Sequence, residues 1–283
     1  MSVELSGQVL WVNGIEGIAN EALCAFNGDV LSIGNLYWDD CTIHLYIIIY
    51  YVYLNRRKFL ITKKVIEMEN TTEVTTTFPQ LNKPAPAFEA RTTHGVKKLS
   101  DYKGRWLVLF SHPADFTPVC TTEFIAFANH HEEFLAEGAD LLGLSIDSYY
   151  SHVAWVRNIK EKFGVDIKFP IIEDLSMSVA KSYGMIHPGA ADTSAVRATF
   201  MIDPQGILRA MVYYPMTNGR SIPEFLRVIR ALKASDEHKI ATPEGWQPGD
   251  KVIVPPPQNT DAAEARITEG YECTDWYFCK KEL

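Results

Sequence analysis

Residues 106–123 read WLVLFSHPADFTPVCTTE, and this stretch decides the fold. Residues 106–110 are all apolar, as in a strand that is buried on both faces of a sheet. Pro118 suits the first turn of a helix, because it has no backbone N–H to leave unpaired. One amphipathic helix is expected to follow, with an apolar face that carries Phe124, Phe127, Phe134 and Leu135.

A strand that leads through a short loop into a helix is the repeating unit of α/β folds. The chain after Met68 continues this alternation. We predict strands at 141–146 and 170–172, helices at 153–163 and 222–232, and a hairpin over 199–214 with an Asp-Pro-Gln-Gly turn. The predicted domain, residues 68–236, is a thioredoxin-like α/β sheet of parallel βαβ units, closed by an antiparallel hairpin and a last helix.

The first 67 residues differ from the rest of the chain. Residues 42–54, TIHLYIIIYYVYL, are apolar and are followed by the basic NRRK. A membrane span needs roughly 20 apolar residues, and a secretory signal places its positive charge before the apolar run. An interfacial anchor stays an alternative for this run, which is rich in tyrosine, but we expect no membrane partner. Met68 resembles a natural start, so we expect residues 1–67 to be a poorly specified leader that is not translated or does not fold.

Residues 237–283 are predicted to form a C-terminal arm. The chain becomes irregular here and is stiffened by the prolines of 254–257. Three adjacent aromatic residues, 276–278, lie between Cys273 and Cys279. Such a cluster needs a surface to cover it, and a neighbouring subunit would supply one. The arm is therefore expected to take part in oligomerisation.

Composition narrows the partners and the compartment. A net charge of −8 and a pI near 5.5 argue against nucleic acid, which favours basic surfaces. The five cysteines are odd in number, are widely spaced and include no CxxC pair. This pattern fits neither a disulfide-stapled secreted domain nor a structural zinc site. We expect individual reactive thiols in the cytoplasm.

Cys120 lies where such a thiol would be reactive. It falls in the first turn of the predicted helix, beyond the carboxyl end of a parallel strand, where α/β sheets place ligands. Backbone N–H groups and the positive helix end favour a thiolate there. Thr117 can offer its hydroxyl to a thiolate or a substrate oxygen. Arg197 opens the apolar strand 196–201 and is the candidate cation.

Pro113-x-x-x-Thr117-x-x-Cys120 is similar to the peroxiredoxin signature, and HPADFTPVCTTE resembles the one-cysteine, or sixth-type, branch of that family. The resemblance covers roughly residues 78–283, and the segments ATPEGWQPGDKVIVPPP and DWYFCKKEL resemble archaeal-type members. Other segments carry it as well: 84–88, 145–148, 196–197, 214–215 and 219–220.

The resemblance implies a cofactor-free peroxidase and assigns its pocket residue by residue. The assigned residues are Cys120 as the peroxidatic cysteine, Pro113 as its shield, Thr117 and Arg197 as the groups that bind and activate peroxide, His112 and Glu123 as supporting partners, and Arg220 as a second cation near the site.

The resemblance also implies how the cycle closes. Cys120 attacks a hydroperoxide and becomes a sulfenic acid, which a second thiol converts to a disulfide. We expect Cys279 of a neighbouring subunit to be that thiol and Cys273 to exchange with it. A thioredoxin-like dithiol then restores the enzyme, and dimers assemble into a decameric ring.

Several alternatives stay open for these residues. Cys120 could be an inert buried thiol, and the enzyme could work without Cys273 and Cys279 as a true one-cysteine peroxidase. Thr117 could be only a helix cap, whereas Arg197 is expected both to pair with Glu123 and to serve the substrate. His112 could be a structural histidine.

Three rival functions were weighed. Thioredoxin-type exchange needs CxxC, but Glu123 stands three positions after Cys120. The phospholipase activity of some sixth-type relatives needs a serine where this chain has Arg105, and a histidine near Ser100. A ring-forming chaperone or a redox sensor remains an alternative function. A Cys120→Ser protein that kept holdase function would separate it from the peroxidase.

Overall fold

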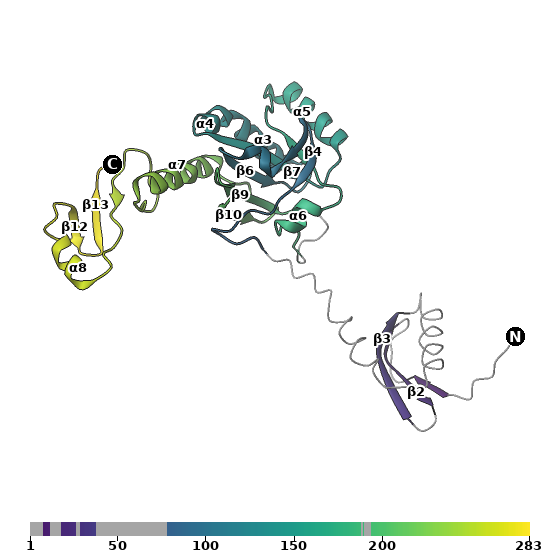
Figure 1. Cartoon of the computed structure of the whole chain (residues 1–283). Coiled ribbons are helices and arrows are strands. Elements are labelled where there is room, and N and C mark those ends of the chain that lie inside the picture. Colours follow the sequence, from purple (N-terminus) through teal and green to yellow (C-terminus); the bar gives the residue numbers. More distant parts are fainter. Residues whose placement is uncertain (1–7, 12–17, 27–28, 38–77, 188, 190–193) are drawn as a thin grey trace. The chain divides into compact units, whose positions relative to one another are not determined.

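The structure is a computed structural model that describes residues 8–11, 18–26, 29–37, 78–187, 189 and 194–283. The chain divides into two compact units, Met1–Val74 and Thr75–Leu283 (Figure 1). In the first unit, β1 (Gln8–Trp11), β2 (Ile18–Phe26) and β3 (Asp29–Tyr37) form an antiparallel sheet.

The apolar run 42–54 lies outside the described residues, and the expectation for the leader stays a prediction. In the part of the chain that the structure describes, no helix has the length and apolar character to cross a membrane.

The second unit is built on a seven-stranded sheet in the order β10-β9-β6-β7-β8-β4-β5. Its centre is parallel and consists of β6 (Trp106–Ser111), β7 (Ala139–Ser145) and β8 (Ile171–Glu173). The remaining strands pair antiparallel: β4 (Glu89–Thr92), β5 (Gly95–Lys98), β9 (Arg197–Ile202) and β10 (Leu208–Tyr214). The predicted α/β sheet with a closing hairpin is confirmed.

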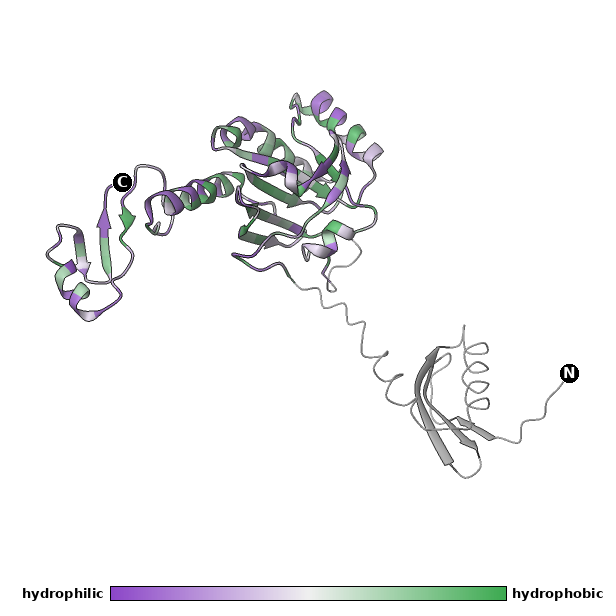
Figure 2. Cartoon of the chain, in the orientation of Figure 1, coloured by the Kyte–Doolittle hydropathy of each residue, from purple (hydrophilic) through white to green (hydrophobic). Residues whose placement is uncertain are grey.

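Strand β6 shows why the sheet has helices on both faces. Trp106, Val108 and Phe110 point into one apolar cluster, whereas Leu107 and Leu109 point into another. A strand with both faces buried reads as a continuous apolar run, as this one does. Figure 2 shows the same concentration of apolar residues in the central strands.

Helices complete the two layers. The first cluster is covered by α3 (Pro118–Asn129), α4 (His131–Ala136), α5 (Tyr149–Phe163) and α7 (Ile222–His238). The second is covered by the short helix η1 (Leu99–Tyr102) and by α6 (Ser178–Ser182).

The single helix predicted after Pro118 is wrong in one respect, because it breaks at His130. That residue adopts φ −96° and ψ 3°, and its carbonyl oxygen accepts from both Glu133 N and Phe134 N at the start of α4. The change of direction lets Phe134 enter the same apolar cluster as Phe127, with ring centroids 6.3 Å apart.

The turn between β9 and β10 is the predicted one. Asp203 Oδ1 accepts from Gln205 N at 3.0 Å and from Ile207 N at 2.9 Å. Gly206 adopts φ +83°, which glycine reaches without strain. This turn fixes the hairpin whose first residue is Arg197.

The C-terminal arm, residues 237–283, is more ordered than its sequence suggests. Ile240, Trp246 and Val252 pack with Ala231 of α7 in a third apolar cluster. The arm then forms a small sheet in the order β11-β13-β12, together with a short helix, α8. Their bounds are β11 (Val252–Ile253), α8 (Thr260–Arg266), β12 (Glu272–Asp275) and β13 (Phe278–Lys281). Strands of two to four residues are too short to show a periodic pattern, so the sequence analysis missed them.

Candidate active site

Cys120 lies in the first turn of α3, as predicted. It is 0% exposed, and it is a free cysteine. Pro118 occupies the start of the helix and Thr117 precedes it. The preceding strand β6 is clamped to β9, because Ser111 Oγ donates to Val196 O at 2.5 Å and accepts from Ala198 N at 3.1 Å. These two bonds fix the end of β6 against β9, and the loop to α3 starts from that point.

Arg197 lies directly beside the sulfur of Cys120. Its Nη1 atom is 3.2 Å from Cys120 Sγ and 2.8 Å from Glu123 Oε2. Its Nε and Nη2 atoms both donate to Met216 O, at 2.9 and 2.8 Å. These bonds fix the guanidinium plane, so that one N–H edge faces the sulfur. The geometry includes both contacts expected for Arg197, with Glu123 and with the reactive thiol.

Glu123 joins two buried arginines. Arg220 donates to it from Nε at 2.8 Å and from Nη2 at 2.9 Å, and the backbone N of Arg220 adds a third bond at 2.8 Å. Burial by itself raises the pKa of Glu123, but the bonds and charges of Arg220 and the charge of Arg197 hold that pKa below its usual value. One carboxylate therefore faces two guanidinium groups, which leaves one positive charge in excess beside Cys120.

Thr117 and Phe116 shape the loop that reaches Cys120. The hydroxyl of Thr117 donates to Ala114 O at 2.8 Å and makes no bond to the free N–H groups of α3, so its side chain does not cap the helix. Phe116 adopts φ +57° and is 56% exposed. A left-handed conformation is strained for an aromatic residue and is typical of loops held for function. Pro113 is buried in the same loop.

A buried network behind the loop contains His112. Its Nε2 atom lies 2.8 Å from Asp115 Oδ1, and His152 Nδ1 lies 2.8 Å from Asp115 Oδ2. His152 Nε2 also lies 3.1 Å from Ile172 O, so both ring nitrogens of His152 face an oxygen atom. Nothing in the sequence pattern predicted this network, because Asp115 and His152 are 37 residues apart and meet only when α5 packs behind the loop.

The network sets the charge of His112. Burial lowers the pKa of His112, and the bond to Asp115 opposes this shift without cancelling it. Asp115 has its pKa well below the usual value, because hydrogen bonds from His112 and His152 outweigh its burial. A neutral His112 that donates from Nε2 has its lone pair on Nδ1, and that atom is buried without a hydrogen-bond partner.

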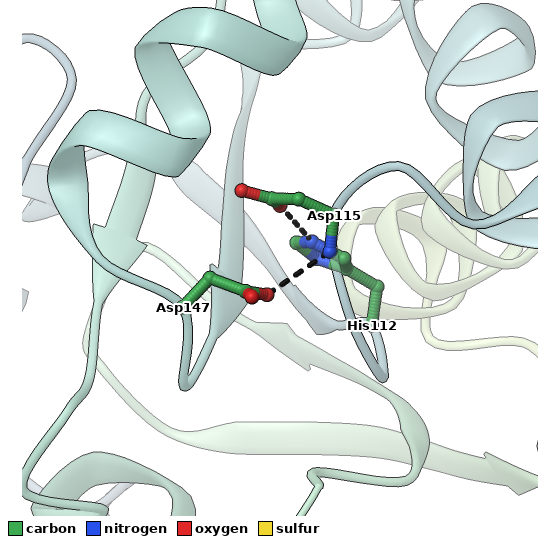
Figure 3. A group of neighbouring side chains, drawn as sticks. All are labelled: His112, Asp115 and Asp147. Atoms are coloured by element: carbon green, nitrogen blue, oxygen red, sulfur yellow. Dashed lines mark hydrogen bonds and ion pairs between the residues drawn. The ribbon is translucent and has the colours of Figure 1, made fainter.

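His112, Asp115 and Asp147 also form a group whose ligand atoms lie within 4.8 Å of one another (Figure 3). Both oxygens of Asp115 already face a histidine nitrogen, and Asp147 Oδ2 accepts from Asp115 N at 3.0 Å and from Ser145 Oγ at 2.7 Å. Hydrogen bonds within the network account for the cluster, and we assign it no metal.

Known proteins match most of the chain. The AhpC/TSA family matches residues 81–211, and the C-terminal domain of 1-Cys peroxiredoxin matches residues 231–270. A peroxiredoxin of Aquifex aeolicus is 58% identical over 216 residues, which cover 72% of this chain and 97% of the relative. The chain belongs to the peroxiredoxin family. Its members are peroxidases, so the predicted enzyme class is confirmed.

Two further relatives place this peroxiredoxin within the family. A peroxiredoxin of the archaeon Methanosarcina mazei is 50% identical over 214 residues, covering 72% of this chain and 98% of the relative. The solved structure of a yeast mitochondrial 1-Cys peroxiredoxin superposes with a TM-score of 0.65 at 40% identity, covering 72% of this chain and 99% of that one. The thioredoxin-like fold and the likeness to one-cysteine and archaeal members are confirmed.

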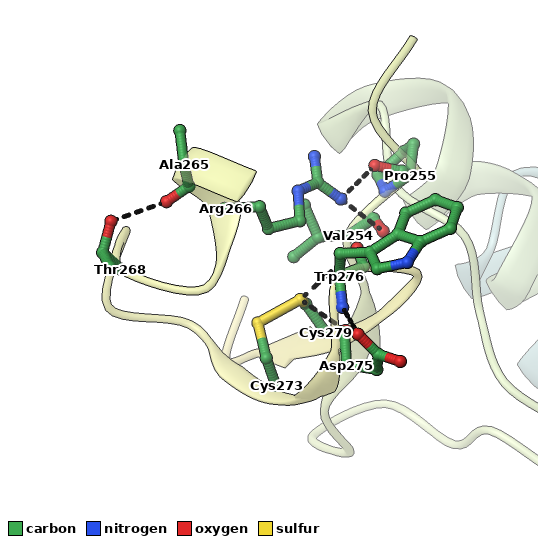
Figure 4. Close-up of a disulfide and its surroundings, with 9 residues drawn as sticks. All are labelled: Val254, Pro255, Ala265, Arg266, Thr268, Cys273, Asp275, Trp276 and Cys279. Carbon is green, nitrogen blue, oxygen red and sulfur yellow. Dashed lines mark hydrogen bonds between the residues drawn. A yellow bond between two sulfur atoms is a disulfide. The ribbon is translucent and has the colours of Figure 1, made fainter. Parts of the chain in front are cut away.

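The arm of this peroxiredoxin contains a disulfide between Cys273 and Cys279 (Figure 4). The two residues face each other across β12 and β13, with Cα atoms 4.0 Å apart. These two cysteines were expected to exchange with each other, and the structure contains them as a bonded pair while Cys120 is free.

The structure brings together most of the pocket that the sequence predicted. Direct contacts join Cys120, Arg197, Glu123 and Arg220, and we call these four residues the Cys120 pocket. His112 belongs to the adjoining Asp115 network instead, through its bond to that carboxylate. The backbone carbonyl of Met216, which orients Arg197, could not be predicted from the sequence, because every residue type has a backbone carbonyl.

Proposed function

We propose that this peroxiredoxin reduces hydrogen peroxide and organic hydroperoxides at Cys120, without a resident cofactor. The observation that carries the proposal is the N–H edge of Arg197, held 3.2 Å from Cys120 Sγ within a pocket that has one excess positive charge. A buried cation beside a buried thiol stabilises both an attacking thiolate and the oxygen anion that leaves.

The chemical step is an in-line displacement. The Cys120 thiolate attacks the nearer oxygen of ROOH, an S–O bond forms, and the O–O bond breaks. The electron pair leaves on RO⁻, which takes up a proton to give water or an alcohol, and Cys120 becomes a sulfenic acid. Arg197 is the donor to the developing charge. Because the Thr117 hydroxyl donates to Ala114 O, its remaining lone pair can accept the peroxide O–H.

The other residues of the site act by positioning or shielding Cys120, Arg197 and Thr117. Glu123 and Arg220 hold Arg197 against the sulfur, since Glu123 bonds both guanidinium groups. Pro113 excludes water from the buried sulfur. His112 and its carboxylate partner brace the loop from behind. Each is a positioning role, and all of these residues lie in the unit Thr75–Leu283.

The arm, residues 237–283, supplies the resolving thiol in this proposal. Cys279 of a neighbouring subunit attacks the sulfenic acid of Cys120, water leaves, and an intersubunit disulfide forms. Cys273 then displaces Cys120 from Cys279, which gives the pair seen in Figure 4. A thioredoxin-like dithiol reduces that pair in the cytoplasm. The yeast relative is described as resolved via glutathione and thioredoxin systems, which supports a thiol reductant. Dimers assembled into a decameric ring would bring the arms to their sites.

The peroxidase proposal is tested by locating the oxidised sulfur. Protein treated with one equivalent of hydrogen peroxide in the presence of dimedone should carry the adduct at Cys120, as mapped by peptide mass analysis. A Cys273→Ser/Cys279→Ser double variant should keep the rate of the first turnover, whereas Cys120→Ser should lose peroxide consumption. A Cys120→Ser protein that consumed peroxide at the wild-type rate would disprove the proposal.

The resolving step has its own test on a denaturing gel without reductant. After one equivalent of peroxide, reduced wild type and Cys273→Ser should give a covalent dimer. Cys279→Ser should stay monomeric and proceed to the sulfinic acid. An undiminished dimer in Cys279→Ser would rule out Cys279 as the resolving thiol and would leave the peroxidase step untouched.

A further inference from the structure

The two sulfurs of the arm disulfide are not equivalent. Cys279 lies on β13, the central strand of the arm sheet, with β11 on one side and β12 on the other. Cys273 lies on β12, an edge strand. Cys279 is 0% exposed, whereas Cys273 is half-buried between the exposed residues Glu272 and Thr274. The two bonded residues therefore differ in exposure, with Cys279 buried and Cys273 partly open to solvent.

Backbone groups complete the cover over Cys279. The carbonyl oxygens of Asp275 and Trp276 lie 3.4 and 3.9 Å from its sulfur, and Val254 N donates to its carbonyl oxygen at 2.9 Å. Figure 4 shows the two carbonyl groups converging on Cys279 from the turn between β12 and β13. Oxygen atoms close to a sulfur repel an incoming thiolate. They accept a hydrogen bond from the same sulfur once it is a thiol.

We infer that an external thiol reduces this peroxiredoxin by attacking Cys273 Sγ, with Cys279 as the leaving group. Thiol–disulfide exchange is an in-line displacement, and access selects the sulfur that is attacked. The reductant thiolate forms a bond to Cys273 Sγ, the Cys273–Cys279 bond breaks, and the electron pair stays on Cys279. Cys279 takes a proton from solvent and can donate it to Asp275 O. The second thiol of the reductant then attacks the reductant sulfur that is bonded to Cys273. A disulfide forms within the reductant, and Cys273 leaves as a thiol.

The place of these exchange steps in the catalytic cycle rests on the proposed function. The steps mean that Cys279, the proposed resolving thiol, is freed in the first exchange step and is never bonded to the reductant. Cys273 is thus the exchange point for the reductant, and Cys279 is the exchange point for Cys120. Each thiol of the arm then has one partner outside the arm, and the reductant reacts with the arm rather than at Cys120.

A trapping experiment tests the inference without peroxide chemistry. Full-length Cys120→Ser protein, oxidised with diamide to the Cys273–Cys279 disulfide, is mixed with glutathione, quenched with acid at low conversion and alkylated. Peptide mass analysis then reports which cysteine carries glutathione and which carries the alkyl group. We expect glutathione on Cys273 at least tenfold more often than on Cys279, with Cys279 alkylated.

The matched control is the same protein in 6 M guanidinium chloride, where the strand order no longer exists and the two sulfurs should react about equally. Equal labelling in the folded protein, or glutathione mainly on Cys279, would overturn the inference. Peroxide consumption by wild type with dithiothreitol as reductant reports separately on the proposed function. Failure of the trapping result with normal peroxide consumption would therefore reject only the site of attack.

Discussion

The Cys120 pocket and the arm sheet (β11, β12 and β13) each bury one sulfur completely, but different forces hold the two sulfurs. Cys120 lies in a domain with two large apolar clusters and is bordered by paired charges. Cys279 is enclosed by two short neighbouring strands and a covalent bond, and the arm has one small apolar cluster near α7.

This difference separates two tasks. A group of fixed charges can stabilise a transition state only if its members do not move when the reaction occurs. In the proposed function the arm delivers a thiol to another site and accepts a reductant, so it has to open at low free-energy cost, and regions with few buried apolar contacts open most easily. On this proposal the chain combines a rigid reactive centre with an arm that is held mainly by strand pairing and a disulfide.

The largest expected effect concerns the charged groups of the Cys120 pocket. Arg197→Met removes the donor beside Cys120 and should slow the second-order reaction with hydrogen peroxide by about 10²–10³, since one such donor contributes that much to a transition state. Stopped-flow kinetics measures the rate, and far-UV circular dichroism checks the fold. Arg209→Met, a half-buried arginine that pairs with Asp203 and Asp236, is the matched control and should keep the rate. An unchanged rate in Arg197→Met would refute its role.

The second effect concerns the stability of the pocket. Glu123→Gln leaves two buried guanidinium groups without their anion, and loss of one partner from a buried ion pair costs about 3–5 kcal/mol. Urea unfolding should show a loss near the lower limit, because the amide oxygen still accepts the two hydrogen bonds made to one of the carboxylate oxygens. Glu137→Gln also removes a carboxylate shared by two cations, but its partners are partly exposed, so it should cost less than about 1 kcal/mol. Equal losses in the two variants would contradict the assignment.

The third effect concerns the stability that the disulfide gives to the arm sheet. Cys273→Ser opens a loop of sequence separation 6, for which the chain-entropy account gives about 2 kcal/mol. The loss should be local. Amide hydrogen exchange should speed up at Val254, whose N–H donates to Cys279 O at 2.9 Å, and stay unchanged at Phe110. Faster exchange at Phe110 would show that the arm and the domain unfold together.

The smallest effect is a pH dependence in the network behind the pocket. Because burial holds the pKa of His112 below its usual value, the unfolded chain binds a proton there that the folded chain does not, and stability falls as the pH drops below about 6.5. The pKa values of Asp115 and Glu123 are also lowered, so their contributions are lost only in more acidic solution.

Urea unfolding at pH 7.5 and 5.5 measures this effect. The stability difference between the two pH values should be smaller in His112→Gln than in wild type. His238→Gln, which replaces an exposed histidine, should leave the difference as it is in wild type. A wild-type difference retained in His112→Gln would show that other groups cause it.

Sequence reasoning predicted the elements whose pattern is local. The strand 106–110, the turn at 203–206 and the position of Cys120 at a helix start all follow from neighbours within a few residues. It failed where the deciding contact is distant or the element is short. The break at His130 depends on the packing of Phe134, and the arm strands depend on pairing with each other.

The sequence was enough to predict the family, the candidate reactive cysteine and the residue types around it, because the spacing from Pro113 to Cys120 is set by a loop and one helical turn. The tertiary structure decided which charges meet. Arg197 reaches Cys120 across 77 residues, and Glu123 lies 97 residues from Arg220. It also decided which arm sulfur is covered, since that depends on Cys279 lying on a central strand and Cys273 on an edge. Burial and charge pairing are properties of the folded packing, and a linear pattern does not contain them.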